Sequence, residues 1–217
     1  MKKPLIAILA LLSTGVKAQD IAPKNHTKNQ HVFEIYANYG IGLSTSMSGN
    51  ALSNTTNEKW TIKDVPSYSG GASIYIIKRL NVGISARSSV WNTTSKLSDN
   101  ITGPTVSPRV TTGKTSVLSV SAFANYNQPI GKGVIYVGGS VGYAIANGDT
   151  KHLAKGKGRD MNGHIGYAHP VVGQILWVTA EAGMSQAKIT PDGQVFSIKR
   201  IYSVTNYPVS LGLKVRI

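Results

Sequence analysis

The chain has 217 residues, no cysteine and a formal net charge of +14 at pH 7. Its length suits one β domain, and without cysteine it has neither stabilising disulfides nor thiolate zinc sites. After the N-terminal segment, no apolar run approaches the roughly 18 residues that a membrane-spanning helix needs. If the protein enters a membrane, it therefore does so as strands.

The first residues have the order of a secretory signal peptide. Lys2 and Lys3 precede the apolar stretch Leu5–Leu12, and Val16-Lys17-Ala18 offers small residues at a cleavage position. The alternative is an N-terminal membrane anchor. Removing the signal peptide takes away three lysines and lowers the formal charge from +14 to +11. The sequence predicts three segments: a signal peptide over residues 1–18, a flexible periplasmic leader over 19–31, and the folded domain over 32–217.

The rest of the chain alternates apolar and polar residues with period two, which is typical of strands with two different faces. The last segment shows it best, because Tyr207 to Ile217 puts large apolar side chains on one face and Lys214 and Arg216 on the other. A soluble core would not bury such a basic pair unpaired, whereas a membrane barrel turns its apolar face to lipid and its polar face to the lumen. Eight strands are predicted, near 32–43, 67–78, 82–91, 116–127, 135–145, 162–171, 175–188 and 202–217.

The connections between these strands alternate in length. Short ones are predicted near 78–81, 128–133 and 172–174, and long ones near 44–66, 92–115, 147–161 and 189–199. An even strand count with short periplasmic turns and long extracellular loops is typical of bacterial outer-membrane barrels. The predicted fold is therefore all-β, an eight-stranded antiparallel up-and-down transmembrane β-barrel with both termini in the periplasm. Aromatic residues, Tyr202 among them, are predicted to face lipid at the two rims.

Several charged residues fall on the inward face of their predicted strands. A barrel of eight strands has an interior only just wide enough for side chains, so unpaired charges there would be costly. We expect two ion-paired layers, one joining Arg87 to Glu181 and one joining Glu34 to Lys214 and Arg216. Such a lumen would have no open pore.

Three stretches carry a resemblance to a known family. They are the leader ending K-A-Q-D, the segment V-T-A-E-A-G-M over Val178–Met184, and the terminal Y-P-V-S-L-G-L-K-V-R-I over Tyr207–Ile217. The chain resembles the small OmpA-type outer-membrane barrels, the "outer membrane protein beta-barrel domain" family of Bacteroidota-like bacteria. The last stretch looks like the signal read by the outer-membrane assembly machinery, although that signal often ends in an aromatic residue rather than Ile217. The resemblance implies architecture and export to the outer membrane, and it specifies no activity.

We searched the sequence for catalytic and metal-binding groups. His164, Ser185 and Glu181 could meet on adjacent strands, but the inward histidine and glutamate would be remote from a lipid substrate, and His169 faces outward near the periplasmic rim. No metal-binding spacing is present. The charge is too scattered for nucleic-acid binding. We therefore predict a non-enzymatic barrel without cofactor; the alternative is a small pore or a lipid A-modifying enzyme.

The third predicted loop is rich in basic residues. Lys151, Lys155, Lys157 and Arg159 outnumber the acidic residues of this loop, and they are candidates for contact with the phosphates or acidic sugars of lipopolysaccharide. The alternative is a solvated loop whose charge only keeps it soluble. The expected partners are thus outer-membrane lipid, lipopolysaccharide and the assembly machinery, and the barrel is expected to be a monomer.

Overall fold

The computed structural model describes residues 32–49, 56–63, 65–99, 109–148, 155–192 and 201–217. The predicted signal peptide and leader lie outside these residues. No helix of the described residues is long and apolar enough to cross a membrane. The strands are β1 (Phe33–Gly49), β2 (Thr56–Lys63), β3 (Val65–Ile77), β4 (Leu80–Asp99), β5 (Arg109–Ile130), β6 (Gly133–Gly148), β7 (Gly156–Val172), β8 (Leu176–Pro191) and β9 (Tyr202–Arg216).

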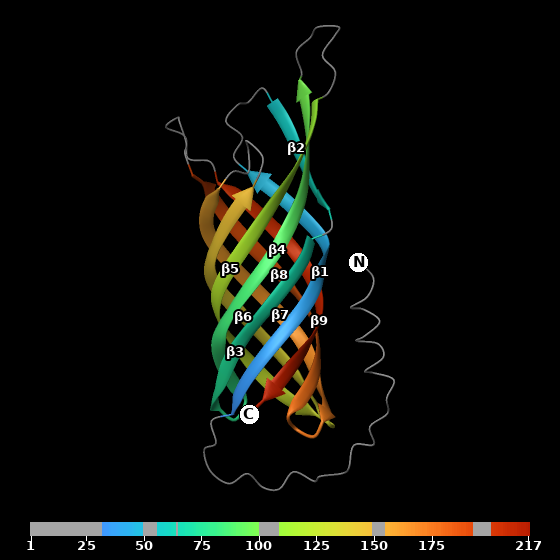
Figure 1. The fold of residues 1–217 in the computed structure, drawn as a ribbon, viewed down its shortest axis with the longest axis vertical. Helices are drawn as coiled ribbons and strands as arrows, with labels where there is room; N and C mark the ends of the chain where they lie inside the picture. Colours follow the sequence, from blue (N-terminus) through green and yellow to red (C-terminus); the bar gives the residue numbers. More distant parts are fainter. Residues whose placement is uncertain (1–31, 50–55, 64, 100–108, 149–154, 193–200) are drawn as a thin grey trace.

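The strands form a closed antiparallel ring, as Figure 1 shows. From β3 to β9 each strand pairs with the next one in sequence, and β1 pairs with β3. The ring is closed by the pairing of β1 with β9, as in Glu34 opposite Arg216. Because β2 and β3 both pair with β4, at its upper and lower parts respectively, they occupy one position in the ring. The nine strands therefore make an eight-stranded up-and-down barrel. The predicted fold is confirmed.

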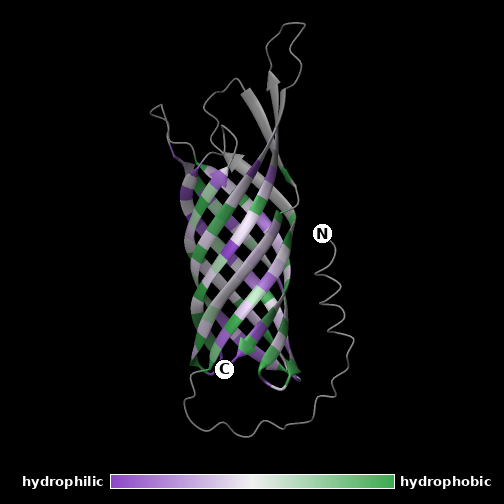
Figure 2. Cartoon of the chain, in the orientation of Figure 1, coloured by the Kyte–Doolittle hydropathy of each residue, from purple (hydrophilic) through white to green (hydrophobic). Residues whose placement is uncertain are grey.

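The two faces of the wall differ as the alternation predicted. Apolar side chains on the outer face are exposed, as in β9, where Leu211 is 61% and Leu213 is 49% exposed. On the opposite parity Lys214 is only 7% exposed. Green and purple segments accordingly alternate along the strands in Figure 2. Tyr202 departs from the prediction, because it lies on the inward parity of β9 and is 9% exposed.

One end of the barrel, here called the turn end, holds three tight turns and the C-terminus (Figure 1). The turns join β3 to β4, β5 to β6 and β7 to β8, at the three predicted positions. Gly131 and Gly173 have φ angles of 57° and 55° in two of these turns, a region that favours glycine because it has no Cβ. The opposite end is here called the loop end.

At the loop end, the strands are longer than the sequence predicted. The four regions predicted as long loops are in part strand, because β1 runs to Gly49, β2 occupies Thr56–Lys63, and β7 begins at Gly156. The pairing of β2 with β4 and of β4 with β5 continues there. Several of these segments, such as N-T-T-S-K near the end of β4, are polar on both faces. Backbone hydrogen bonds continue the strand pairing there. The strand prediction ended earlier because it depended on the alternation of apolar residues, which stops before these segments.

Candidate functional site

A charged cluster closes the lumen at the turn end, and Glu34 of β1 is its centre. The Glu34 side chain is fully buried, with Lys214 Nζ at 3.2 Å from Oε2 and Arg216 Nη2 at 2.7 Å from Oε1. Tyr75 and Asn81 also donate hydrogen bonds to this carboxylate, at 3.2 and 3.0 Å. The strand register explains the arrangement, because Glu34 lies directly opposite Arg216 on β9. This set of residues is called the Glu34 cluster below.

Aromatic rings cover the cations of the Glu34 cluster. The guanidinium of Arg216 lies 4.5 Å from the ring centre of Trp177, and Lys214 Nζ lies 5.1 Å from that of Tyr136. The Trp177 indole N–H donates to the carbonyl of Gln174 at 2.8 Å, which fixes the ring in the adjacent turn. Cation–π contacts of this kind gain strength when they are desolvated. The cluster is therefore a packed plug rather than a set of hydrated charges.

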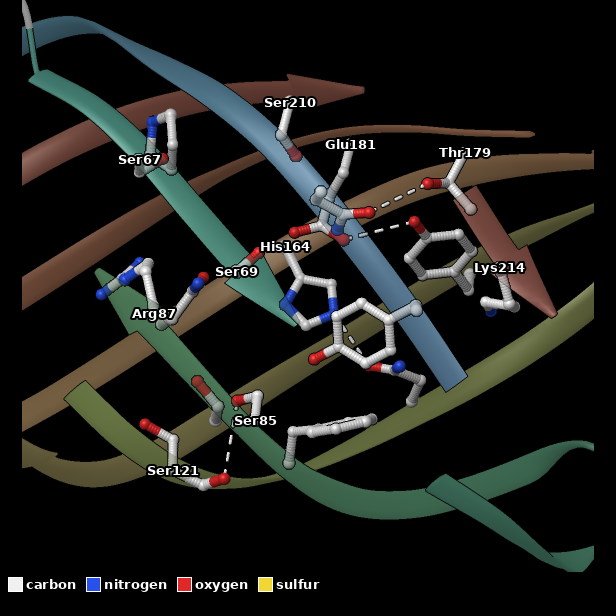
Figure 3. A pocket seen from close by; sticks show the side chains of 18 of the residues that line it. Ser67, Ser69, Ser85, Arg87, Ser121, His164, Thr179, Glu181, Ser210 and Lys214 are labelled. Atoms are coloured by element: carbon white, nitrogen blue, oxygen red, sulfur yellow. Dashed lines mark hydrogen bonds between the residues drawn. The ribbon is translucent and has the colours of Figure 1, made fainter. Parts of the chain in front are cut away.

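A cavity of about 80 Å³ lies above this plug, in the middle of the lumen. Figure 3 shows Glu181, His164, Arg87 and Lys214 among its lining residues. Glu181 accepts a hydrogen bond from the Tyr136 hydroxyl at 3.2 Å, and His164 Nε2 lies 2.8 Å from Asn125 Oδ1. The cavity is large enough for only a few water molecules.

Arg87 forms its ion pair with Asp160, not with Glu181. Its Nη2 lies 2.8 Å from both carboxylate oxygens of Asp160, which is 2% exposed. The predicted Arg87–Glu181 pair is therefore wrong, and the reason is that Asp160 had been placed in a loop. It belongs to β7, and the inward sequence Gly158, Asp160, Asn162 was the signal that could have found it.

This pairing predicts different costs for two substitutions that each remove one acidic charge. We expect Asp160→Asn to lower the free energy of unfolding by about 1.5–3 kcal/mol, the range for hydrogen bonds to charged groups. Glu181→Gln should cost less than half as much, because the amide oxygen of the new side chain could still accept the bond from Tyr136. Urea unfolding in lipid vesicles measures both. Equal costs would contradict the assignment of Arg87 to Asp160.

An apolar layer fills the lumen towards the loop end. Trp91 of β4 is its largest member and is 4% exposed. Only a void of about 10 Å³ separates this layer from the Arg87–Asp160 pair. We call it the Trp91 layer; its buried members are Ile62, Val65, Trp91, Val117, Ala144, Ala146, Ala187, Ile189 and Val204. The described lumen is thus closed by the Glu34 cluster at one end and by the Trp91 layer at the other.

The candidate catalytic residues are not assembled. His164 contacts Asn125, and no described hydrogen bond joins it to Ser185 or Glu181. His169 is exposed on the outer face close to the turn end, where its Nδ1 lies 3.1 Å from the Tyr167 hydroxyl. Among the described residues, no group of three or more acidic or histidine side chains could hold a metal ion.

A second feature lies on the outer face of β7 and β8 near the loop end. Lys157, Arg159 and Lys188 are all exposed there, and Arg159 stands directly opposite Lys188 in the register. Like charges in this position repel each other. Within the described part of the chain, none of the three belongs to an ion pair. We call these three residues the basic patch.

The four basic residues predicted for lipid contact lie in different parts of the chain. Lys157 and Arg159 lie in β7 and not in a loop, and Lys151 lies outside the described residues. Lys155 is exposed just before β7 and stands beside Asp192, whose backbone amide donates to the Lys155 carbonyl at 2.7 Å. Lys188 was not predicted as a site residue, because its relation to Arg159 depends on the register of two strands.

The sequence matches no protein-family model, and no curated protein is similar to it. Solved structures give similar barrels. Neisserial surface protein A is 16% identical, with a TM-score of 0.47, over 85% of this chain and 97% of that chain. The attachment invasion locus protein Ail of Yersinia pestis is 10% identical, with a TM-score of 0.45, over 87% and 100%. The outer membrane protease OmpT of Escherichia coli is 8% identical, with a TM-score of 0.47, over 89% and 100%.

These likenesses concern the fold and transfer no activity. The family predicted from the three stretches of sequence stays a prediction. What the chain itself shows is a closed antiparallel ring with an apolar outer wall. A barrel of this kind leaves no backbone polar group unpaired in lipid, and this architecture is that of outer-membrane proteins.

Proposed function

We propose that this protein is a non-enzymatic barrel of the bacterial outer membrane that does not conduct and acts through contacts at its loop end. The observation that supports this most strongly is the filled lumen, in which the Glu34 cluster and the Trp91 layer lie in series. Chemistry or transport through the interior would need an accessible passage. The turn end then faces the periplasm and the loop end faces the cell exterior.

The filled lumen predicts the absence of ion conduction. We expect the purified protein to give no stepwise current in a planar lipid bilayer at moderate voltage, because charges and apolar side chains leave no continuous water path. The measurement also separates this proposal from the alternative of a small pore. Regular conductance steps of the unmodified protein would overturn it.

We further propose that the basic patch contacts the anionic groups of lipopolysaccharide. Tyr143 of β6 is 50% exposed and stands directly opposite Arg159, and exposed tyrosines are typical of the membrane–water interface. This supports a position of the basic patch at the level of the lipid headgroups, next to the apolar belt. An anion placed between Arg159 and Lys188 would relieve the repulsion between them.

This contact predicts salt-dependent retention on lipopolysaccharide. We expect Arg159→Ser with Lys188→Ser to lower retention on immobilised lipopolysaccharide at about 0.1 M salt. The difference from the unmodified protein should shrink towards 1 M, as the Debye length falls from about 10 Å to about 3 Å. Lys78→Ser with Lys132→Ser, which removes the same charge at the turn end, is the matched control and should change retention little. Equal losses in the two variants would show an effect of net charge alone.

A further inference from the structure

The outer wall of the barrel is hollowed beside the basic patch. The register aligns Ala124, Gly139 and Gly163 in one row across β5, β6 and β7. All three are exposed and face outward. The next outward row carries Val141 and Met161, which are 60% and 55% exposed. The small side chains form an open apolar depression, here called the groove, within a wider hollow of the outer wall whose lining residues come from strands between β1 and β8.

Gly163 forms an open part of the floor of this groove. A Cβ atom added to this residue would meet no atom within 4 Å, whereas one added to the inward Gly83 would lie 2.7 Å from the Phe123 ring. The space above Gly163 is therefore outside the protein fold and available to another molecule. In a membrane, the molecules in contact with this wall are lipid acyl chains.

The groove ends next to the basic patch. Met161 and Gln186 line the groove and are directly opposite each other in β7 and β8. The next outward pair of the same two strands is Arg159 and Lys188, about 7 Å farther along, since each strand residue advances about 3.3 Å. The wall thus carries an apolar groove, an amide and a pair of cations in that order. A phosphorylated lipid has the same order of chemical groups.

We propose that the groove and the basic patch together bind one molecule of the phosphorylated glycolipid of the outer leaflet. One acyl chain lies in the groove over Gly163, and a phosphate lies between Arg159 and Lys188. The proposal rests on the lipopolysaccharide contact proposed above and adds a defined chain site to it. A phosphate accepts hydrogen bonds from both cations. An acyl chain held in the groove takes the place of the mobile lipid chains that would otherwise cover this apolar surface.

The test is native mass spectrometry of the full chain in mild detergent with added lipid A. We expect one bound lipid A per unmodified protein. Gly163→Leu should lower the affinity for lipid A about tenfold, because the leucine side chain would occupy the place of the acyl chain. Ala180→Leu enlarges an exposed alanine of the same wall that lies outside the groove, and it should leave binding unchanged. Because a Cβ atom at position 163 meets no atom within 4 Å and the side chain would point outward, urea unfolding should change little.

Different outcomes distinguish the groove from the headgroup contact. If Arg159→Ser with Lys188→Ser loses lipid A while Gly163→Leu binds it normally, the contact with phosphate stands and the groove is wrong. The groove is also wrong if Gly163→Leu and Ala180→Leu weaken binding equally. If the unmodified protein binds dephosphorylated lipid A as well as lipid A, both proposals fail. Equal binding of phosphatidylglycerol would overturn the choice of a glycolipid.

Discussion

Glu34→Ala is expected to lower the free energy of unfolding by about 3–5 kcal/mol, the cost of leaving a buried charge without its partner. Lys214 and Arg216 both depend on this one carboxylate, at 3.2 and 2.7 Å. Their side chains are only 9% and 21% exposed, so water would replace the carboxylate poorly. The Glu34 side chain is also the acceptor for the Tyr75 hydroxyl and the Asn81 amide. Urea unfolding in lipid vesicles measures the loss.

Two further variants separate charge from packing in this cluster. Glu34→Gln keeps the volume and an acceptor oxygen but removes the charge, so most of the loss should remain. Adding Lys214→Met to Glu34→Gln removes one of the two cations that have lost their ion-pair partner, and it should recover part of the free energy of unfolding. Buried ion pairs replaced by apolar residues behave in the same way. If Glu34→Gln were as stable as the unmodified protein, the cluster would not depend on its ion pairs.

The alternation of the sequence was enough to predict the ring. In β9, apolar side chains at every second position identify the lipid-facing wall, and the opposite parity identifies residues of the lumen such as Lys214. This information is local, because a strand's two faces follow from its own residues. The same reasoning fails for β2, where Glu58, Lys59 and Lys63 are interspersed with Trp60 and Ile62. Its only apolar pair on one face is Trp60 and Ile62, which is too short to predict a strand, and pairing with β4 keeps the segment in the barrel.

Contacts across the lumen could be predicted only in part. Glu34 meets Lys214 and Arg216 because β1 and β9 are adjacent in the ring, which the strand order alone fixes. Arg87 and Asp160 come from β4 and β7, which do not pair. The tilt and stagger of the strands determine whether two such residues lie at the same height in the lumen. Tilt and stagger cannot be predicted from the sequence of one strand. Together with the placement of Asp160 in a loop, this is why the partner of Arg87 was predicted wrongly.

Trp91→Ala is expected to destabilise the barrel by about 3–5 kcal/mol, the range for truncating a large aromatic residue in a packed core. Trp91 is 4% exposed and belongs to the Trp91 layer together with Val117 and Val204. The ring of strands prevents the wall from collapsing onto the space that is left. Leu118→Ala is the matched control on the outer face, where Leu118 is 49% exposed. It should cost much less, because acyl chains fill the gap.

The conductance of Trp91→Ala tests whether the Glu34 cluster and the Trp91 layer each close the lumen independently. Trp91→Ala widens the lumen towards the loop end but leaves the Glu34 cluster intact at the turn end. We therefore expect Trp91→Ala to remain non-conducting in a planar bilayer although its free energy of unfolding is reduced. Trp91→Phe, which restores most of the lost volume, should recover much of the stability. Current steps from Trp91→Ala alone would mean that the Glu34 cluster does not seal the barrel, and that the Trp91 layer is the barrier that keeps the protein closed.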